Sequence, residues 1–178
     1  MEPCLIIASP QMKDPFFEGV VILVCQHDDN GALGLVINRE TSLSVQNVLE
    51  QLSVELAHSY EEHAVNWGGP VEPGAGFIVF PGQVPDDEGW NVGQGIAVSP
   101  SRDQLIEALV QDEPFLLCLG YAGWGSGQLD DEIRNGSWIV TEVDLDVVLA
   151  TAMDERYDSA LAKLGLEATG VWMQPIDE

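Results

Sequence analysis

The sequence predicts one domain of the α/β (α+β) class, in which helices flank a compact, mixed and largely antiparallel sheet or a barrel-like core. The chain has 178 residues and a hydrophobic content of 46%, which suits a single core over residues 1–178. Short β-branched runs alternate irregularly with segments of helical periodicity, unlike the regular pattern of a doubly wound parallel sheet. Asn30-Gly31 lies between two of these runs and is typical of a β-hairpin, so at least one pair of strands is antiparallel.

The N-terminal strands are predicted from continuous apolar runs. They cover Leu5–Ala8, Val20–Cys25 and Leu33–Ile37. The second and third are joined by HDDNGALG, in which Asn30 and Gly31 both accept the positive φ of a type I′ turn. We therefore expect these two strands to pair with each other.

The first helix is predicted over residues 43–56, where apolar residues recur at helical spacing. Thr41 or Ser42 can cap its start. A polar loop, HSYEEHAVN, follows, and the glycines and proline of Trp67-Gly68-Gly69-Pro70-Val71 then predict a turn. The next predicted elements are a strand over Gly76–Phe80, a loop over Pro81–Asn91 and a strand over Gly95–Val98.

The second half of the chain continues the alternation of helices and strands. Ser101 and Gln104 fit a capping box that opens a helix, and the buried stripe of this helix includes Leu105 and Leu109. Gly165 is a plausible C′ residue for the last helix. The other predicted elements are strands over Phe115–Leu119 and Ser137–Thr141, and helical segments near Asp146–Ala150 and Asp154–Leu164.

The net charge is the most unusual property of the sequence. Six Lys and Arg residues, scattered singly, face 30 acidic residues, and the formal net charge is −24. A nucleic-acid-binding protein neutralises phosphates with clustered basic residues, so the composition argues against direct binding to DNA, and the same field repels anionic membranes. Two explanations stay open: a host whose salty cytoplasm screens acid–acid repulsion, and an acidic surface that binds a basic partner.

The N-terminus and the cysteines predict a cytoplasmic protein. No positive region precedes Leu5–Ala8, and this run is too short for a signal peptide. No stretch approaches the roughly 20 apolar residues of a membrane-spanning helix. Cys4, Cys25 and Cys118 have no C-x-x-C spacing and lie in apolar runs, which predicts buried, reduced thiols.

Patterns of catalytic or metal-binding residues are weak. Cys25 and His27 are two apart on a predicted strand, so they should face the same side, where a Cys–His pair can form a thiolate nucleophile. Neighbours on one face of a strand are more often packing partners. His58, Glu62 and His63 do not match the H-E-x-x-H pattern of a zinc site. We therefore predict no catalytic residue, metal or cofactor, and keep an enzyme that uses Cys25 and His27 as an alternative.

The stretch GYAGWGSGQLDDE, from Gly120 to Glu132, is the strongest candidate for a site. Its glycine spacing matches neither a Walker A loop nor G-x-G-x-x-G. The acids at its end fall in the predicted first turn of a helix, where they complement the helix dipole and repel an anionic ligand. Two interpretations remain: a tight turn packed under Trp124, which we favour, and a loop that binds a neutral or cationic ligand or a protein partner.

Several motifs occur in a distinctive order. They are Leu5–Pro10, Asp14-Pro15-Phe16-Phe17, HDDNGALGLVINR from His27, Gly68-Gly69-Pro70-Val71, and GYAGWGSGQLDDEIRNGSWIV from Gly120. With these motifs, over nearly its whole length, the chain resembles the YqgE/AlgH family of small bacterial proteins.

The resemblance implies an α/β fold with a compact mixed sheet or barrel-like core and no established activity. The family carries the label of a transcriptional regulator of alginate synthesis. This chain departs from the family at two places. Ala75-Gly76-Phe77 leads to Phe80 where the family often has Arg-Gly-Phe-x-x-His, and Tyr157 stands where a Trp is common. Any role that needs that Arg or His is therefore not carried over to this chain.

We therefore predict a non-enzymatic binding or regulatory protein with a glycine-rich loop surface, which binds an unknown small molecule or a protein partner. The alternative is a transcriptional regulator that acts indirectly rather than by binding DNA. The candidate binding residues are His27, Asn30, Gly31, Asn38, Gly68, Gly69, Pro70, Gly120, Tyr121, Gly123, Trp124, Gly125, Gly127 and Gln128.

Overall fold

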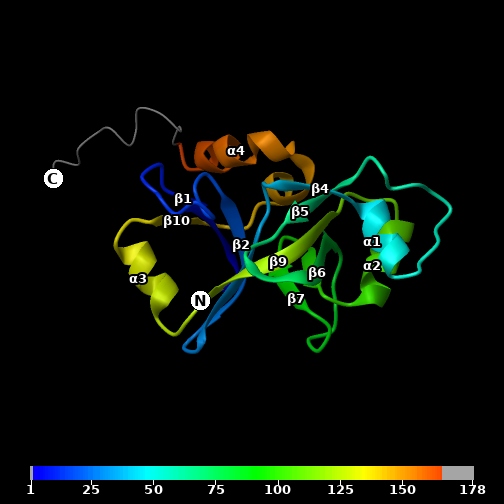
Figure 1. Ribbon diagram of the computed structural model, residues 1–178. Coiled ribbons are helices and arrows are strands. Elements are labelled where there is room, and N and C mark those ends of the chain that lie inside the picture. The colour runs from blue at the N-terminus through cyan, green and yellow to red at the C-terminus, as the bar shows by residue number, and fades with distance from the viewer. Residues whose placement is uncertain (1, 166–178) are drawn as a thin grey trace.

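The computed structural model describes residues 2–165 and has the predicted α+β class (Figure 1). Its strands are β1 (Cys4–Ala8), β2 (Val21–Asp28), β3 (Gly31–Val36), β4 (Glu40–Ser44), β5 (Ala64–Trp67), β6 (Val71–Pro81), β7 (Trp90–Gly93), β8 (Ile96–Ser99), β9 (Leu116–Trp124) and β10 (Trp138–Thr141). They form one sheet in the order β10-β1-β2-β3-β9-β6-β8-β7, to which β5 adds β4. Among the described strands only β5 and β9 pair in parallel, so the sheet is mixed and largely antiparallel, as predicted.

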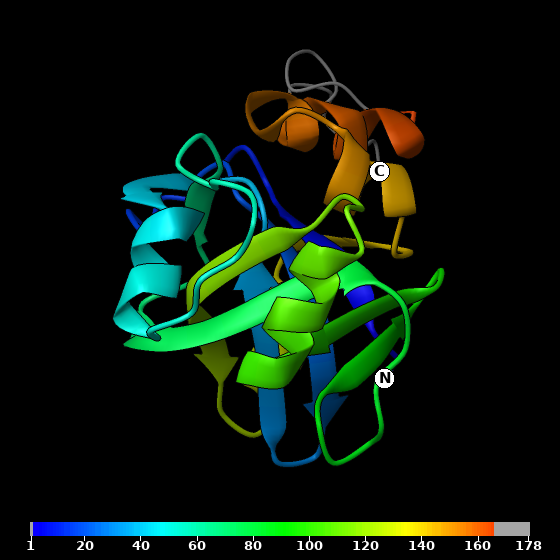
Figure 2. The same ribbon diagram turned by 90° about the vertical axis from the view of Figure 1, so that its right-hand side faces the viewer.

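Helices cover this sheet on several sides (Figures 1 and 2). They are α1 (Val45–Gln51), α2 (Arg102–Val110), α3 (Gln128–Arg134) and α4 (Arg156–Lys163), with a π-helical turn over Asp146–Ala150 and a 3-10 turn over Met153–Glu155. α1 and α2 bury Leu49 and Leu105 in one core cluster with β6 and β9. Leu129 of α3 belongs to a second cluster with β1 and β2, and Leu161 of α4 belongs to a third.

Strand β9 connects the two halves of the sheet. Its first part, up to Leu119, pairs with β5 and β6, and Tyr121 still pairs with β6, whereas Ala122–Trp124 pair with β3. Between these parts Gly120 has φ 79°, a conformation that L side chains disfavour. The sheet also curls until β7 approaches β2, where the Trp90 indole donates a hydrogen bond to Gln26 Oε1 at 3.1 Å. Gly120 thus lies where the pairing of β9 changes from one half of the sheet to the other.

The predicted β2–β3 hairpin is confirmed, but its turn differs from the prediction. Asp28 pairs with Gly31, so the two central residues are Asp29 and Asn30 rather than Asn30 and Gly31. Asn30 does not have the positive φ of a type I′ turn. Instead the Asp28 carboxylate accepts a hydrogen bond from the Asn30 amide at 2.8 Å and closes the turn.

The predicted helix over residues 43–56 is too long at both ends. α1 begins after Ser44, whose side chain accepts from Asn47 N and whose backbone N–H donates to Asn47 Oδ1, a complete capping box. It ends before Ser53, which has φ 57°. The residues ahead of the helix form β4, and the predicted loop HSYEEHAVN ends in β5. Sequence analysis missed both strands because they are short and one of them is largely polar.

The glycine motif also differs from its prediction as a turn. β9 runs on past the predicted end at Leu119 to Trp124, because bonds to β3 and β6 hold the glycines in the sheet. The predicted start of α2 is confirmed, since Ser101 Oγ accepts from Gln104 N at 3.3 Å. The side chain of Gln104 donates to Glu88 instead of completing a capping box.

Candidate functional site

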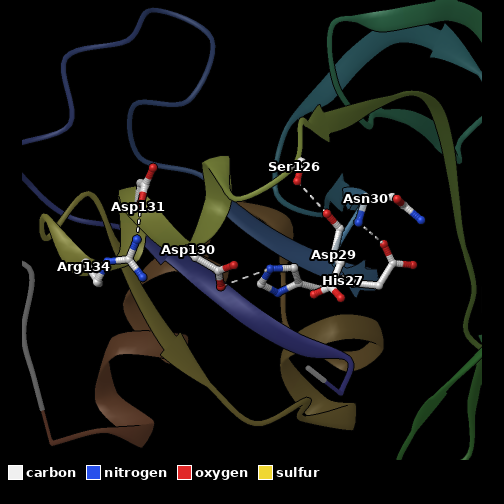
Figure 3. Close-up of polar contacts among 8 residues, drawn as sticks. His27, Asp29, Asn30, Ser126, Asp130, Asp131 and Arg134 are labelled. Atoms are coloured by element: carbon white, nitrogen blue, oxygen red, sulfur yellow. Dashed lines mark hydrogen bonds and ion pairs between the residues drawn. The ribbon is translucent and has the colours of Figure 1, made fainter.

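The candidate binding residues fall mainly in three motifs: the hairpin around Asn30-Gly31, the stretch from Gly120 to Gln128, and Gly68-Gly69-Pro70. The first two of these motifs meet at one end of the molecule. The β2–β3 hairpin and the segment between β9 and α3 lie against each other (Figure 3). The Ser126 hydroxyl donates to the Asp29 carbonyl oxygen at 2.6 Å, and His27 Nε2 lies 3.3 Å from a carboxylate oxygen of Asp130. His27 is buried, whereas Asp130 is half exposed. We name the surface made by this contact the platform, and it consists of Asp28–Asn30, Gly123, Gly125–Gln128 and Asp130.

Gly31 brings the hairpin close to the end of β9. A Cβ atom at this position would lie 2.2 Å from the carbonyl oxygen of Trp124, and φ is 137°. Both facts exclude an ordinary side chain here. The glycine of the predicted Asn30-Gly31 signal is therefore needed for the close approach between two strands.

Two tryptophans under the platform share one carboxylate. The indole N–H groups of Trp124 and Trp138 donate to Glu132 Oε1 at 3.0 and 2.9 Å, and Gln128 Nε2 donates to the other oxygen at 3.0 Å. Phe17 packs against both indole rings. These bonds satisfy the buried indole groups and fix α3 against β9. Trp124 is thus part of the support of the platform rather than of its exposed surface.

The third motif, Gly68-Gly69-Pro70, contacts the middle of β9 rather than the platform. The Gly68 amide donates to the Leu119 carbonyl, and the Gly68 carbonyl accepts from the Val36 amide, each at 2.8 Å. Gly68 and Gly69 are buried, and the half-buried Pro70 leads the chain into β6. The backbone groups of Gly68 are therefore used by neighbouring strands.

The glycines at this place allow two backbones to cross in contact. A Cβ atom on Gly69 would lie 2.1 Å from the carbonyl carbon of Tyr121, and one on Gly120 would lie 2.2 Å from the Gly69 carbonyl oxygen. A Cβ on Gly68 would lie 2.3 Å from the Gly120 carbonyl oxygen. Real side chains do not occupy such positions, so Gly68, Gly69 and Gly120 serve the packing of the chain against itself.

Asn38 likewise has a structural contact. Its Oδ1 accepts from the Val21 amide at 2.9 Å, and its Nδ2 donates to the Gly19 carbonyl at 3.0 Å. These two bonds tie the end of β3 to the segment that enters β2. Asn38 therefore holds neighbouring strands of the sheet together.

Gly123 and Gly125 differ from the other glycines of their motif. Both are exposed, and neither has a positive φ. A Cβ on Gly123 would lie 3.6 Å from Tyr121 Cε2, and one on Gly125 would lie 3.9 Å from Gln128 Oε1, which are ordinary contacts. Gly127, in contrast, has φ 75° at the N-cap of α3. The fold therefore explains Gly127 but requires neither Gly123 nor Gly125 to be a glycine.

Tyr121 lies beside this exposed glycine face. Its hydroxyl donates to a carboxylate oxygen of Glu72 at 3.1 Å, and its ring meets Phe77 edge-on. Burial and the hydrogen bond with Glu72 raise the pKa of the Tyr121 hydroxyl. Tyr121 therefore stays protonated and holds Glu72 near the start of β6.

The sequence predicted that Cys25 and His27 face the same side of β2, and this prediction is wrong. The register of β2 against β3 shifts between Val24 and Gln26, and this bulge breaks the two-residue alternation. Cys25 belongs to the core cluster shared with α4, whereas His27 contacts Asp130 of α3. Burial raises the pKa of the Cys25 thiol and raises that of Cys118 to about 12, so neither thiol is an accessible thiolate.

The other titratable residues considered from sequence are also separated from the platform. His63 stacks on Phe115 at a ring-centroid distance of 5.4 Å and contacts Tyr60. Within residues 2–165, no three potential metal ligands lie close enough together to hold an ion. Within the same residues, no helix has the length and the apolar character needed to cross a bilayer.

Sequence analysis missed a cavity of about 230 Å³ between α1 and α2. Its floor is formed by β6 and β9, and its walls come from the two helices. The available sequence signal was the pair Gly74 and Gly76, which sit two apart on one face of a strand. The lining residues are Leu43, Asn47, Val48, Gln51, Leu52, Gly74, Gly76, Ile78, Ser99, Pro100, Ser101, Arg102, Leu105, Leu117 and Leu119.

Comparison with known proteins gives a consistent result. The AlgH-like family model matches residues 5–169. A UPF0301 protein of Xanthomonas axonopodis pv. citri is 38% identical over 92% of this chain and 88% of its own length. A UPF0301 protein of Thioalkalivibrio sulfidiphilus is also 38% identical, over 91% of this chain and 88% of its own.

Two solved structures have the same fold. The solution structure of the AlgH protein from Pseudomonas aeruginosa superimposes with a TM-score of 0.77 at 32% identity, over 99% of this chain and 95% of that one. The crystal structure of protein DIP2367 from Corynebacterium diphtheriae gives a TM-score of 0.73 at 20% identity, over 99% and 88% of the two chains, a likeness of fold.

Proposed function

The chain belongs to the AlgH-like family, and from this premise we propose that it is a non-enzymatic binding protein of the cytoplasm that acts through a protein partner. The proposed contact surface is the platform. A regulatory role would be exerted through this partner rather than by binding DNA.

The observation that carries the proposal is the pair of exposed glycines, Gly123 and Gly125. Neither the conformation nor the packing of the folded chain requires a glycine at these positions. A glycine in or beside a strand costs conformational entropy and buries no side chain, so it is expected where another backbone approaches closely. A partner's chain lying over Gly123 and Gly125 accounts for both residues.

The platform is also held in one arrangement before a partner binds. The Ser126–Asp29 bond and the His27–Asp130 pair join segments that are about a hundred residues apart in sequence. A surface that is already ordered loses little entropy on binding. This supports the platform as a recognition surface.

The charge of the platform indicates the chemistry of the partner. Asp28, Asp29 and Asp130 contribute carboxylates, and the hydrogen bond from the Asn30 amide lowers the pKa of Asp28. Electrostatic complementarity favours a partner segment that carries Lys or Arg. The same carboxylates, and the net charge of −24, disfavour nucleic acid.

An enzyme that uses Cys25 and His27 is the weaker alternative. The thiol is buried with a raised pKa, and the histidine side chain contacts α3 on the other side of the sheet. A thiolate nucleophile needs an accessible thiol next to its base. We therefore keep binding as the conclusion.

The test is a differential purification from host cytosol, with the whole chain as bait. Asp29→Lys reverses a charge on the platform, while the Ser126 bond to the Asp29 backbone is kept. Glu61→Lys makes the same change in charge on an exposed residue in the loop after α1 and serves as the matched control.

We expect a basic partner that the wild type and Glu61→Lys retain and that Asp29→Lys and Gly125→Leu lose. Equal recovery by all four baits would contradict the proposal. A gel-shift series at low salt adds a second check, because phosphate contacts are strongest there. A DNA shift by the wild type would favour the direct regulator instead.

A further inference from the structure

Two glycines in β6 have no explanation in the fold. Gly74 and Gly76 both have a negative φ, so any L residue can adopt their backbone conformation. A Cβ on Gly74 would meet no atom within 4 Å, and one on Gly76 would meet only Leu119 Cδ2, at 3.7 Å. A strand interior normally carries side chains, because a glycine there weakens it. What the two glycines have in common is the cavity that they leave open.

The floor of the cavity is apolar. β6 contributes Gly74, Gly76 and Ile78, which alternate along one face, and β9 contributes Leu117 and Leu119 next to them. α1 adds Val48 beside the amides of Asn47 and Gln51, and α2 adds Leu105, so the volume of about 230 Å³ has an apolar floor and mixed walls. An engineered apolar cavity of about 150 Å³ in another protein takes up benzene, so this one has room for about nine non-hydrogen atoms.

The mouth of the cavity carries one positive charge. Arg102 is the only charged residue among the lining residues that the described chain provides. Acidic residues are 30 of the 178 in this protein, and none of the lining residues is acidic. One guanidinium nitrogen of Arg102 donates to the Leu52 carbonyl at 3.2 Å, which holds the side chain across the gap between the helices.

The position of Arg102 leaves room for an anionic group. The Leu52 carbonyl is the one hydrogen-bond partner of its guanidinium within the described residues. A guanidinium has five N–H donors in a planar fork, which matches the two oxygens of a carboxylate. An apolar floor below a single arginine therefore suits a molecule with an apolar body and one carboxylate.

We infer that the cavity between α1 and α2 is a binding site for a small monocarboxylate with an apolar tail, whose carboxylate lies against Arg102 and whose tail covers Gly74 and Gly76. This site is separate from the platform and does not depend on it. In Figure 1, α1 and α2 lie at the end of the molecule away from α3.

Octanoate is the probe for a calorimetric titration of the full chain, in about 0.15 M salt so that the net negative charge of the protein is screened beyond about 8 Å. Octylamine has the same tail and the opposite charge, and octan-1-ol has no charge. We expect saturable binding of octanoate, with the alcohol weaker by at least tenfold and the amine weaker still.

Two substitutions test the two parts of the site. Gly74→Leu places a side chain at the mouth with no backbone clash, and Arg102→Met removes the charge while keeping a long apolar chain. We expect each to weaken octanoate binding by at least tenfold. Gly125→Leu, the same substitution at an exposed glycine of the platform, is the control and should bind octanoate like the wild type.

Three results would overturn the inference. They are the absence of octanoate binding to the wild type, equal binding of octanoate and octylamine, and unchanged binding by Gly74→Leu. An amide NMR spectrum of each variant shows whether it is folded, so that a lost signal in calorimetry cannot be mistaken for a lost site. The same titration leaves the platform untested, so its failure is distinct from a failure of partner binding.

Discussion

Two pairs of glycines along neighbouring parts of the sheet differ in whether the folded chain requires a glycine at their positions. Gly69 and Gly120 lie where two backbones cross, and a Cβ on either would come within about 2.2 Å of backbone atoms. Gly74 and Gly76 lie a few residues further along, in β6, and a Cβ on either would meet open space or an ordinary contact. The first pair is required by the folded chain, whereas the second pair is not.

The difference teaches how a glycine-rich motif can be divided into structural and functional positions. All four residues look alike in the sequence, since each lies within three residues of another glycine. The space around a hypothetical Cβ, together with φ, separates them. The same division applies within the stretch from Gly120 to Gly127, where Gly123 and Gly125 belong with the second kind.

The largest effect on stability is expected where the backbones of Gly69 and Gly120 cross. Gly69→Ala should reduce the free energy of unfolding by about 3 kcal/mol or more, because overpacking and backbone strain act together there. Urea denaturation of the purified variant measures it. Gly123→Ala is the matched control and should stay within about 0.5 kcal/mol of the wild type. A Gly69→Ala protein as stable as the wild type would show that the crossing is not tight.

Thiol labelling sharpens the same comparison. Cys118 is fully buried. It lies next to the crossing, because a Cβ atom on Gly68 would be 3.1 Å from the Cβ atom of Cys118. Burial raises its pKa to about 12, so the folded wild type presents almost no thiolate at pH 8. We expect no reaction in the folded wild type and faster labelling of Cys118 in Gly69→Ala, detected by mass spectrometry. Fast labelling of the folded wild type would contradict the described burial.

A smaller effect is expected at Gly31. Gly31→Ala should cost about 1–3 kcal/mol, because the hairpin must move away from the Trp124 carbonyl. The shift should be local, and the amide signals of Asp29 and Ser126 should move together as their contact loosens. If the amide signals of Asp29 and Ser126 stayed in place, the two segments would not be joined as described.

The sequence predicted the elements whose signals are local. Ser101 marked the start of α2, the acids after Gln128 marked the first turn of α3, and the residues around Asn30 marked a hairpin. It did not predict β4 and β5, which are held by pairing with distant segments rather than by an apolar pattern.

The candidate site was only partly predictable for the same reason. Glycines at the crossing read as a turn, because nothing local indicates that Gly69 will face Tyr121 across fifty residues of chain. The bulge in β2 that separates Cys25 from His27 has no marker in the sequence. The cavity depends on how α1 and α2 pack, so only the pair Gly74 and Gly76 hinted at it.

The most direct test of the central claim is the stability of Gly74→Val. If Gly74 is kept for the cavity and not for the fold, a β-branched residue in this strand should leave the free energy of unfolding unchanged or raise it by about 0.5 kcal/mol. Urea denaturation of the variant and the wild type, side by side, measures the difference. A loss of more than about 1 kcal/mol would contradict the claim, because it would place Gly74 with the glycines that the fold requires.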